Sequence, residues 1–159
     1  MKKNEKENIV ISYHLPTYKE IPAVGLYLDQ TSKYINEALE GLPECTITNS
    51  MISNYVKKKL IDNPVKKQYG RDQIVYLIFI AVTKSAISLE DADRLFRLQK
   101  EKYSTQEAYE FFCERFDKLL NDENVSTGKS EEARLLDNII MTVVSQIRLH
   151  QLLEKTLYK

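Results

Sequence analysis

The run Ile74–Val82 consists of nine consecutive apolar or aromatic residues. A segment that is apolar on every side has to be buried on every side, so other elements must surround this run at the centre of a domain. It is too short to cross a bilayer as a helix, which needs about 20 apolar residues. The pattern alone fits a buried strand or a buried helix. We favour a helix, because the neighbouring segments are helical and no hairpin partner is evident.

Three other segments carry apolar residues at the three- and four-residue spacing of an amphipathic helix: Val24–Leu39, Ser88–Gln99 and Ser104–Leu120. Ser88 and Ser104 each precede an acid by three positions, which is the pattern of a capping box at a helix start. The expected inward positions are Val24, Leu28, Ile35 and Leu39 in the first segment, Leu89, Ala92 and Phe96 in the second, and Ala108, Phe111, Phe112, Phe116 and Leu119 in the third.

The C-terminal segment Ser130–Leu157 has the longest helical pattern, about 40 Å at the rise of an α-helix. Its apolar seam has the spacing of a heptad repeat and comprises Ala133, Leu136, Ile140, Val143, Ile147 and His150. Such a helix either packs against its own chain or pairs with a second chain, and the pattern leaves both open. We expect His150 to be a packed or interface residue.

The chain is poor in the residues that catalysis and metal binding use. Its 159 residues include two histidines (His14 and His150), two cysteines (Cys45 and Cys113) and four isolated glycines. These suit no catalytic triad, metal cluster or phosphate loop, so we expect no enzyme, no cofactor and no metal. We expect Cys113 to be buried and Cys45 to lie in a loop, where the sequence leaves its exposure open. Reduced cysteines and the lack of a signal peptide predict a cytoplasmic protein without membrane contact.

Positive charge is concentrated in one short segment. The whole chain has a formal net charge of zero, but residues 49–71 carry six basic side chains and one acid. The flanking segments are both slightly acidic. A basic patch within an otherwise balanced chain is typical of an element that contacts phosphates. The basic residues are Lys57, Lys58, Lys59, Lys66, Lys67 and Arg71.

The first part of this segment is predicted to be a helix over residues 50–61, with Thr48, Asn49 and Ser50 as capping candidates at its start. One side is apolar and holds Met51, Ile52, Tyr55, Val56 and Leu60. The other side carries Ser50, Ser53, Asn54, Lys57 and Lys58. Asn can bond both groups of an adenine edge, and Ser and Lys can contact bases or phosphates. A solvated lysine-rich face without a partner fits the composition equally well.

The second part is a short loop with Pro64, followed by Tyr69-Gly70-Arg71. We expect Lys66, Lys67 and Arg71 in this loop to hold a DNA backbone. From Ser50 to Phe96 the order of elements resembles the winged helix-turn-helix of MerR-type regulators. This resemblance implies a recognition helix containing Tyr55, a basic wing and a further helix after Tyr69.

The chain departs from the MerR pattern at several positions. Ser53 and Asn54 stand where that family has an Arg and a Tyr, and Lys59 stands where it has Gly. Most of the chain also resembles a bacterial domain-of-unknown-function family, number 1836, whose members are described as DNA-binding. The residues that carry this second resemblance are Ile21-Pro22, Leu26 to Gln30, Thr48 to Ile61 and Pro64 to Tyr69.

Together these patterns predict an all-α fold with a MerR-like winged helix-turn-helix embedded in a helical bundle and a long C-terminal helix. Residues 1–20 form a partly disordered arm, 21–100 the DNA-binding domain, and 101–159 a helical hairpin for packing or dimerisation. We expect a homodimeric bacterial transcription regulator that binds double-stranded DNA. The alternative is a protein-interaction module with the same fold. The expected DNA contacts are Asn49, Ser50, Ser53, Asn54, Tyr55, Lys57, Lys58, Lys66, Lys67, Gln68, Tyr69 and Arg71.

Overall fold

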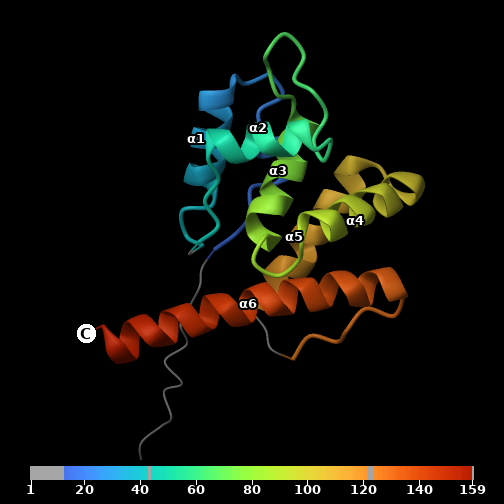
Figure 1. Cartoon of the computed structure of the whole chain (residues 1–159). Coiled ribbons are helices and arrows are strands. Elements are labelled where there is room, and N and C mark those ends of the chain that lie inside the picture. Colours follow the sequence, from blue (N-terminus) through green and yellow to red (C-terminus); the bar gives the residue numbers. More distant parts are fainter. Residues whose placement is uncertain (1–12, 43, 122–123, 159) are drawn as a thin grey trace, which may run out of the picture.

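The computed structural model describes residues 13–42, 44–121 and 124–158, and its helices are labelled in Figure 1. Within these residues there are six α-helices, one short 3-10 helix and no strand beyond isolated bridges, so the predicted all-α class is confirmed. The elements are η1 (Tyr18–Glu20), α1 (Leu28–Ala38), α2 (Asn49–Lys57), α3 (Arg71–Thr83), α4 (Leu89–Lys102), α5 (Thr105–Asn121) and α6 (Glu131–Leu157).

The apolar run predicted at the centre is helix α3, and Figure 1 shows it between α2 and α6. Every residue from Ile74 to Thr83 except Tyr76 is buried. The hydroxyl of Thr83 donates to the carbonyl of Phe79 at 2.7 Å, so this buried polar group is satisfied within the helix. Helices α1, α5 and α6 all pack on α3, which explains why no side of it is polar.

Helix α1 begins later than the apolar spacing predicted. Val24 was expected on its inner face but is 75% exposed, and the helix starts only at Leu28. The residues before it are extended, because the backbone of Leu26 pairs with that of Tyr69. Gly25 lies against the Gln68 side chain, where an added Cβ would come within 2.7 Å of Gln68 Cβ. The close approach of these two segments therefore requires glycine at this position.

The other predicted helix starts are confirmed. The hydroxyls of Ser88, Ser104 and Ser130 each accept a hydrogen bond from the backbone N–H three residues later, at 3.1 Å. On α5, Phe112 and Phe116 are buried as expected. Phe111 is 42% exposed, so its predicted place in the core is wrong. Tyr109, which was not among the predicted inward residues, is buried.

Helix α6 divides into a packed part and a projecting part. Ile140, Val143 and Ile147 of the predicted seam are buried, so this part packs within its own chain. Beyond Arg148, the apolar side chains are open to solvent, and Figure 1 shows the end of α6 running past the other helices. The exposed residues of this part are Leu149, Leu152, Leu153, Leu157 and Tyr158. His150 lies here, with its Nε2 atom 3.6 Å from Glu154.

The N-terminal arm is packed on the helices where the structure describes it. Leu15 is buried, and the hydroxyl of Tyr109 donates to the carbonyl of Pro16 at 2.6 Å. Residues 1–12 of this arm, which was predicted to be partly disordered, lie outside the described residues. Cys45, whose exposure the sequence left open, is buried, and burial raises the pKa of its thiol to about 11. No helix in the described part of the chain is long and apolar enough to cross a membrane.

Candidate nucleic-acid interface

Helices α1 and α2 are locked together by polar side chains at both ends of their connection. The Asn36 amide donates to the carbonyl of Ile47 and accepts from its N–H, each at 2.8 Å. Asn49, at the start of α2, donates to Asp29 and accepts from the hydroxyl of Ser32 at 2.6 Å. The two helices therefore form a rigid pair, and Asn49 is used within it.

The two sides of α2 are those that its sequence predicts. The hydroxyl of Thr48 accepts from the N–H of Met51 at 3.1 Å and caps the helix start. Ile52 and Tyr55 are buried against the core. The polar side is open to solvent and carries Ser50, Ser53, Asn54, Lys57 and Lys58.

Helix α2 ends at Lys57 rather than at Ile61, because the chain turns sharply through Lys59. Lys59 has a φ of 63°, in the left-handed region. The N–H of Lys59 bonds to the carbonyl of Val56 at 3.0 Å, and that of Leu60 to the carbonyl of Tyr55 at 2.9 Å. This is the Schellman arrangement, in which the left-handed position usually holds glycine. It turns the Lys59 side chain to solvent and Leu60 into the core.

The predicted basic loop is a tight hairpin. Val65 and Gln68 exchange two backbone hydrogen bonds of 3.0 Å, which leaves Lys66 and Lys67 alone at the tip. Their φ angles are 51° and 65°. A two-residue turn with both φ angles positive favours Asn-Gly, because other side chains are strained in this conformation. Here two lysines occupy it.

The hairpin is held at its base by neighbouring elements. The N–H of Tyr69 donates to the carbonyl of Leu26 at 2.7 Å, which joins the hairpin to the segment before α1. The Gln73 amide donates to the carbonyls of Asp62 and Asn63 at 2.8 and 3.1 Å. The hairpin is therefore anchored to the segment before α1 and to α3, although its tip extends outward.

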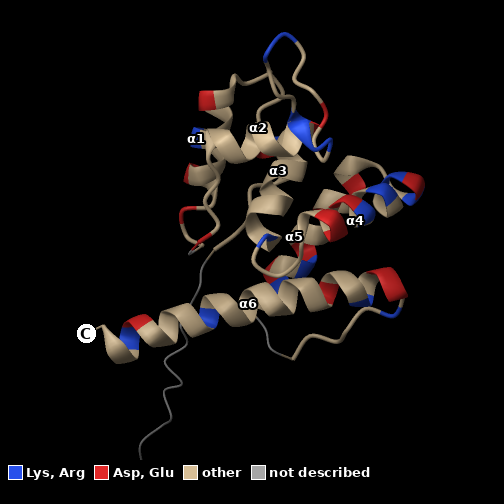
Figure 2. Ribbon diagram, in the orientation of Figure 1, with Lys and Arg blue, Asp and Glu red and all other residues tan. Residues whose placement is uncertain are grey.

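We call the five exposed lysines of this region the lysine surface: Lys57, Lys58, Lys59, Lys66 and Lys67. Figure 2 shows them as two blue groups, one at the end of α2 and one at the hairpin tip. None of the ion pairs formed within residues 13–42, 44–121 and 124–158 includes any of them. The lysine surface is thus a concentration of positive charge without a partner in the described part of the chain.

The remaining predicted contact residues are engaged within the protein. Tyr55 and Tyr69 are 4% and 5% exposed and belong to the core. The Arg71 guanidinium donates to the carbonyl of Ile21 at 2.9 Å and lies 5.0 Å from the centre of the Tyr18 ring. Gln68 is half-buried against Gly25. Of the predicted set, the side chains open to solvent are those of Ser50, Ser53, Asn54, Lys57, Lys58, Lys66 and Lys67.

Lys59 is the residue of this surface that sequence reasoning left out. On a helix extended to Ile61, Lys59 falls on the apolar side, which argued against a contact. The signal for the earlier helix end is the pair Leu60-Ile61, because two adjacent apolar residues can both be buried once the helix has stopped. Both are buried here.

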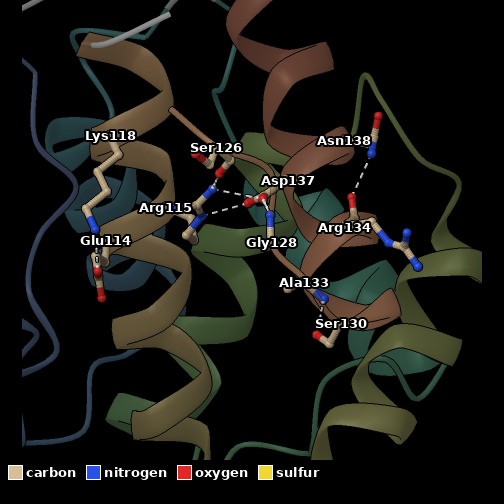
Figure 3. Close-up of polar contacts among 10 residues, drawn as sticks. All are labelled: Glu114, Arg115, Lys118, Ser126, Gly128, Ser130, Ala133, Arg134, Asp137 and Asn138. Atoms are coloured by element: carbon tan, nitrogen blue, oxygen red, sulfur yellow. Dashed lines mark hydrogen bonds and ion pairs between the residues drawn. The ribbon is translucent and has the colours of Figure 1, made fainter. Parts of the chain in front are cut away.

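A second group of charges, far from the lysine surface, is paired and buried. Figure 3 shows Arg115 of α5 and Asp137 of α6 joined by two hydrogen bonds, each of 2.8 Å. The Gly128 N–H also donates to Asp137 at 2.8 Å, and Arg115 donates to the carbonyl of Ser126. Burial raises the pKa of Asp137, but these hydrogen bonds outweigh it, and the pKa lies below its usual value. This pair fastens α6 to α5.

Helices α1 and α2, the hairpin and α3 thus define a small helical protein with an exposed basic element on a rigid support. The described residues contain no group of acids, histidines and cysteines that could hold a metal ion. A family model, described as Domain of unknown function (DUF1836), matches residues 16–112. The match covers more than half of the chain, which therefore belongs to this family. Neither a curated protein nor a solved structure matches the chain.

The family match begins before η1 and ends within α5. It includes the whole lysine surface and its supports. Helix α6 lies beyond it, although the sequence resemblance was expected over most of the chain.

Proposed function

We propose that this protein is a DNA-binding transcription regulator of the bacterial cytoplasm. Helix α2 enters the major groove, and the lysine surface contacts phosphates on both sides of it. In this proposal, α1 and α2 are the helix-turn-helix and the Lys66–Lys67 hairpin is the wing of a MerR-like unit. Two contacts of the hairpin support this assignment: it is joined to the segment that leads into α1, the partner helix of α2, and to α3.

The observation that carries the proposal is the backbone conformation of Lys59, Lys66 and Lys67. All three have positive φ angles, which cost a residue with a side chain about 1–2 kcal/mol. Glycine or asparagine would remove most of this cost at each position. Backbone strain concentrates at functional sites. Cations held in such conformations without an ion-pair partner suit an external anion, and the DNA backbone supplies a row of them.

The polar side of α2 supplies groups for sequence recognition. Asn54 and Ser53 are exposed in the middle of this side and can bond base edges, while Lys57 and Lys58 lie at its end beside the wing. Phosphate contacts set the position of a protein on DNA, and base contacts set its sequence preference. Asn54 is thus the proposed base contact and the lysine surface the proposed phosphate contact.

We include dimerisation in the proposal. A nine-residue helix contacts too few base pairs for useful specificity, and a second copy doubles the site. The projecting end of α6 suits this role, because Leu149, Leu152, Leu153 and Leu157 are exposed on it. An acidic protein could bind the same lysines, and it would compete with DNA while showing no preference for base sequence.

The test changes one lysine from each part of the lysine surface, as Lys58→Glu with Lys67→Glu. DNA sites are first selected from a random library with the full-length wild-type chain, and affinity is measured by fluorescence anisotropy. We expect the affinity to fall at least about 100-fold, because two phosphate contacts become repulsive. In a plot of log affinity against log salt concentration, the variant should have a shallower slope than the wild type, by about 0.9 for each contact removed.

The matched control is Lys19→Glu with Lys129→Glu, which changes the net charge equally at two exposed lysines outside the lysine surface. It should bind within about threefold of wild type, since distant exposed charges are screened at physiological salt. Equal losses in the two variants would place the effect in overall charge and contradict the proposed site. A parallel Asn54→Ala variant should keep its phosphate-dependent affinity but lose about 1–3 kcal/mol of base discrimination.

A further inference from the structure

A large apolar pocket lies among α3, α4, α5 and the start of α6, away from the lysine surface. Its volume is about 640 Å³, within the range of about 300–1,000 Å³ typical of small-molecule sites. Phe79, Phe96 and Phe112 form its floor, and Tyr103 and Phe111 also line it. We propose that this pocket binds an uncharged, ring-containing small molecule. The proposal concerns a separate site and does not depend on DNA binding.

The floor of the pocket is rigid, because its rings hold one another. The ring centres of Phe79 and Phe96 are 5.6 Å apart, and those of Phe79 and Phe112 are 5.0 Å apart, both in edge-to-face contact. Tyr76 packs against Phe96 at 4.7 Å in the same way. Such a wall exists before any ligand arrives, and its ring faces and edges fit a flat aromatic or alicyclic molecule.

Two further aromatic side chains line the pocket and remain open to solvent. Phe111 is 42% exposed and Tyr103 is 52% exposed. Phe111 lies on the pocket side of α5, where the sequence predicted a core residue. Its exposure is explained if the apolar contact it lacks is provided by a bound molecule, because covering a phenyl ring stabilises by about 25 cal/mol for each Å² removed from water.

The charged groups of the lining argue for an uncharged ligand. Lys102 of α4 pairs with Glu132 of α6, and Arg115 pairs with Asp137. Glu107 accepts from the N–H of Ser104 at 3.3 Å and completes the cap of α5. The remaining charged group of the lining, Lys129, is exposed in the loop before α6. A charged ligand would have to break one of these arrangements or stay at the loop.

One polar cluster in the lining can orient a ligand. The Tyr76 hydroxyl lies 2.8 Å from the Gln99 amide oxygen and 3.0 Å from the Thr105 hydroxyl. Hydroxyl groups can both donate and accept, so this cluster can bond one carbonyl or hydroxyl group. An otherwise apolar pocket with a few convergent polar groups is the usual form of a small-molecule site.

The test uses two dyes that share their rings and differ in charge. N-phenyl-1-naphthylamine is uncharged, and 8-anilinonaphthalene-1-sulfonate carries a sulfonate on the same frame. Both fluoresce more strongly in apolar surroundings. We expect the uncharged dye to bind the full-length chain at a single saturable site, at least about tenfold more tightly than the sulfonate. Saturating dye should also raise the melting temperature, because it binds only the folded state.

The variant that locates the site is Ala108→Trp, which places an indole in the pocket from near the start of α5. It should weaken dye binding at least about tenfold. The control Glu110→Trp adds the same indole at an exposed position of the same helix and should bind as wild type. A milder variant, Phe111→Ala, removes an exposed wall ring and should weaken binding about threefold or more, with Tyr158→Ala as its control.

Two results would overturn the proposal. The first is a wild-type chain without saturable binding of the uncharged dye; an altered oligomeric mass of Ala108→Trp alongside this result would assign the pocket to a protein contact. The second is wild-type affinity in both Ala108→Trp and Phe111→Ala while both are folded. Folding is checked by circular dichroism and melting temperature. If Ala108→Trp is unfolded, the dye affinity of Phe111→Ala tests the proposal instead.

Discussion

The lysine surface and the Arg115–Asp137 pair show two opposite treatments of charge in one small chain. The five lysines are exposed, and three of them are held by a strained backbone without an ion-pair partner in the described residues. Arg115 and Asp137 are 12% and 0% exposed at their side chains, and each charge meets the other in a two-bond contact. The charges that stabilise the fold are paired and shielded from solvent. Those of the lysine surface are exposed and can bind an external partner.

The largest effect should come from breaking the paired side of this comparison. Asp137→Asn leaves the largely buried Arg115 guanidinium without a counter-charge, which typically costs about 3–5 kcal/mol. We expect the free energy of unfolding to fall by that amount in a urea titration. The control is Glu114→Gln, which removes an exposed pair with Lys118 on the same helix and should cost under about 1 kcal/mol. Equal costs for both variants would show that burial of the pair is unimportant.

The same pair gives the wild-type chain a pH signature with a definite sign. The pKa of Asp137 is lower in the folded chain than its usual value of 3.8. The unfolded chain therefore takes up this proton first as the pH falls. The resulting stability is fully present above the usual pKa and is lost as the pH falls through the lowered one. Asp137→Asn should lack this part of the acid dependence.

These two charge sites differ in how far the sequence predicts them. The exposed side of α2, with Ser50 and Asn54, follows from helical periodicity, which depends only on neighbouring residues. The basic hairpin follows from a local cluster of lysines after Pro64. The contact between Arg115 and Asp137 joins residues 22 positions apart on two helices, and no local pattern specifies which charges meet.

The same limit applies to the pocket and to the helix ends. The pocket is lined from four helices, so its existence depends on how they pack, and the sequence predicted Phe111 in the core. Helix α2 was predicted four residues too long because Lys57, Lys58 and Lys59 are all acceptable in a helix. The stop comes from burial of Leu60 and Ile61, which is a tertiary effect.

The next effect, smaller in free energy, concerns the hairpin tip. Lys66→Asn with Lys67→Gly replaces two strained cations by the residues that the turn favours. We expect stability to rise by about 1–2 kcal/mol while DNA affinity falls about tenfold, because two phosphate contacts are lost. The control Lys19→Asn with Lys129→Asn removes the same charge elsewhere and should change neither measurement appreciably. A tip variant that gains stability and keeps its DNA affinity would show that these lysines do not contact DNA.

The smallest effect separates strain from charge at a single residue. Lys59→Gly relieves a left-handed backbone that costs lysine about 1–2 kcal/mol. Glycine also makes the unfolded chain more flexible, which offsets about 0.5–1 kcal/mol of that gain. The net rise in unfolding free energy should therefore be about 0.5–1 kcal/mol, measured by urea denaturation. Lys58→Gly is the matched control and should not stabilise, because Lys58 has an ordinary φ of −80°.

If Lys59→Gly also weakens DNA binding severalfold with a smaller salt slope, Lys59 contacts a phosphate. If its affinity is unchanged, Lys59 does not contact DNA, and the left-handed turn serves only to bring Leu60 into the core.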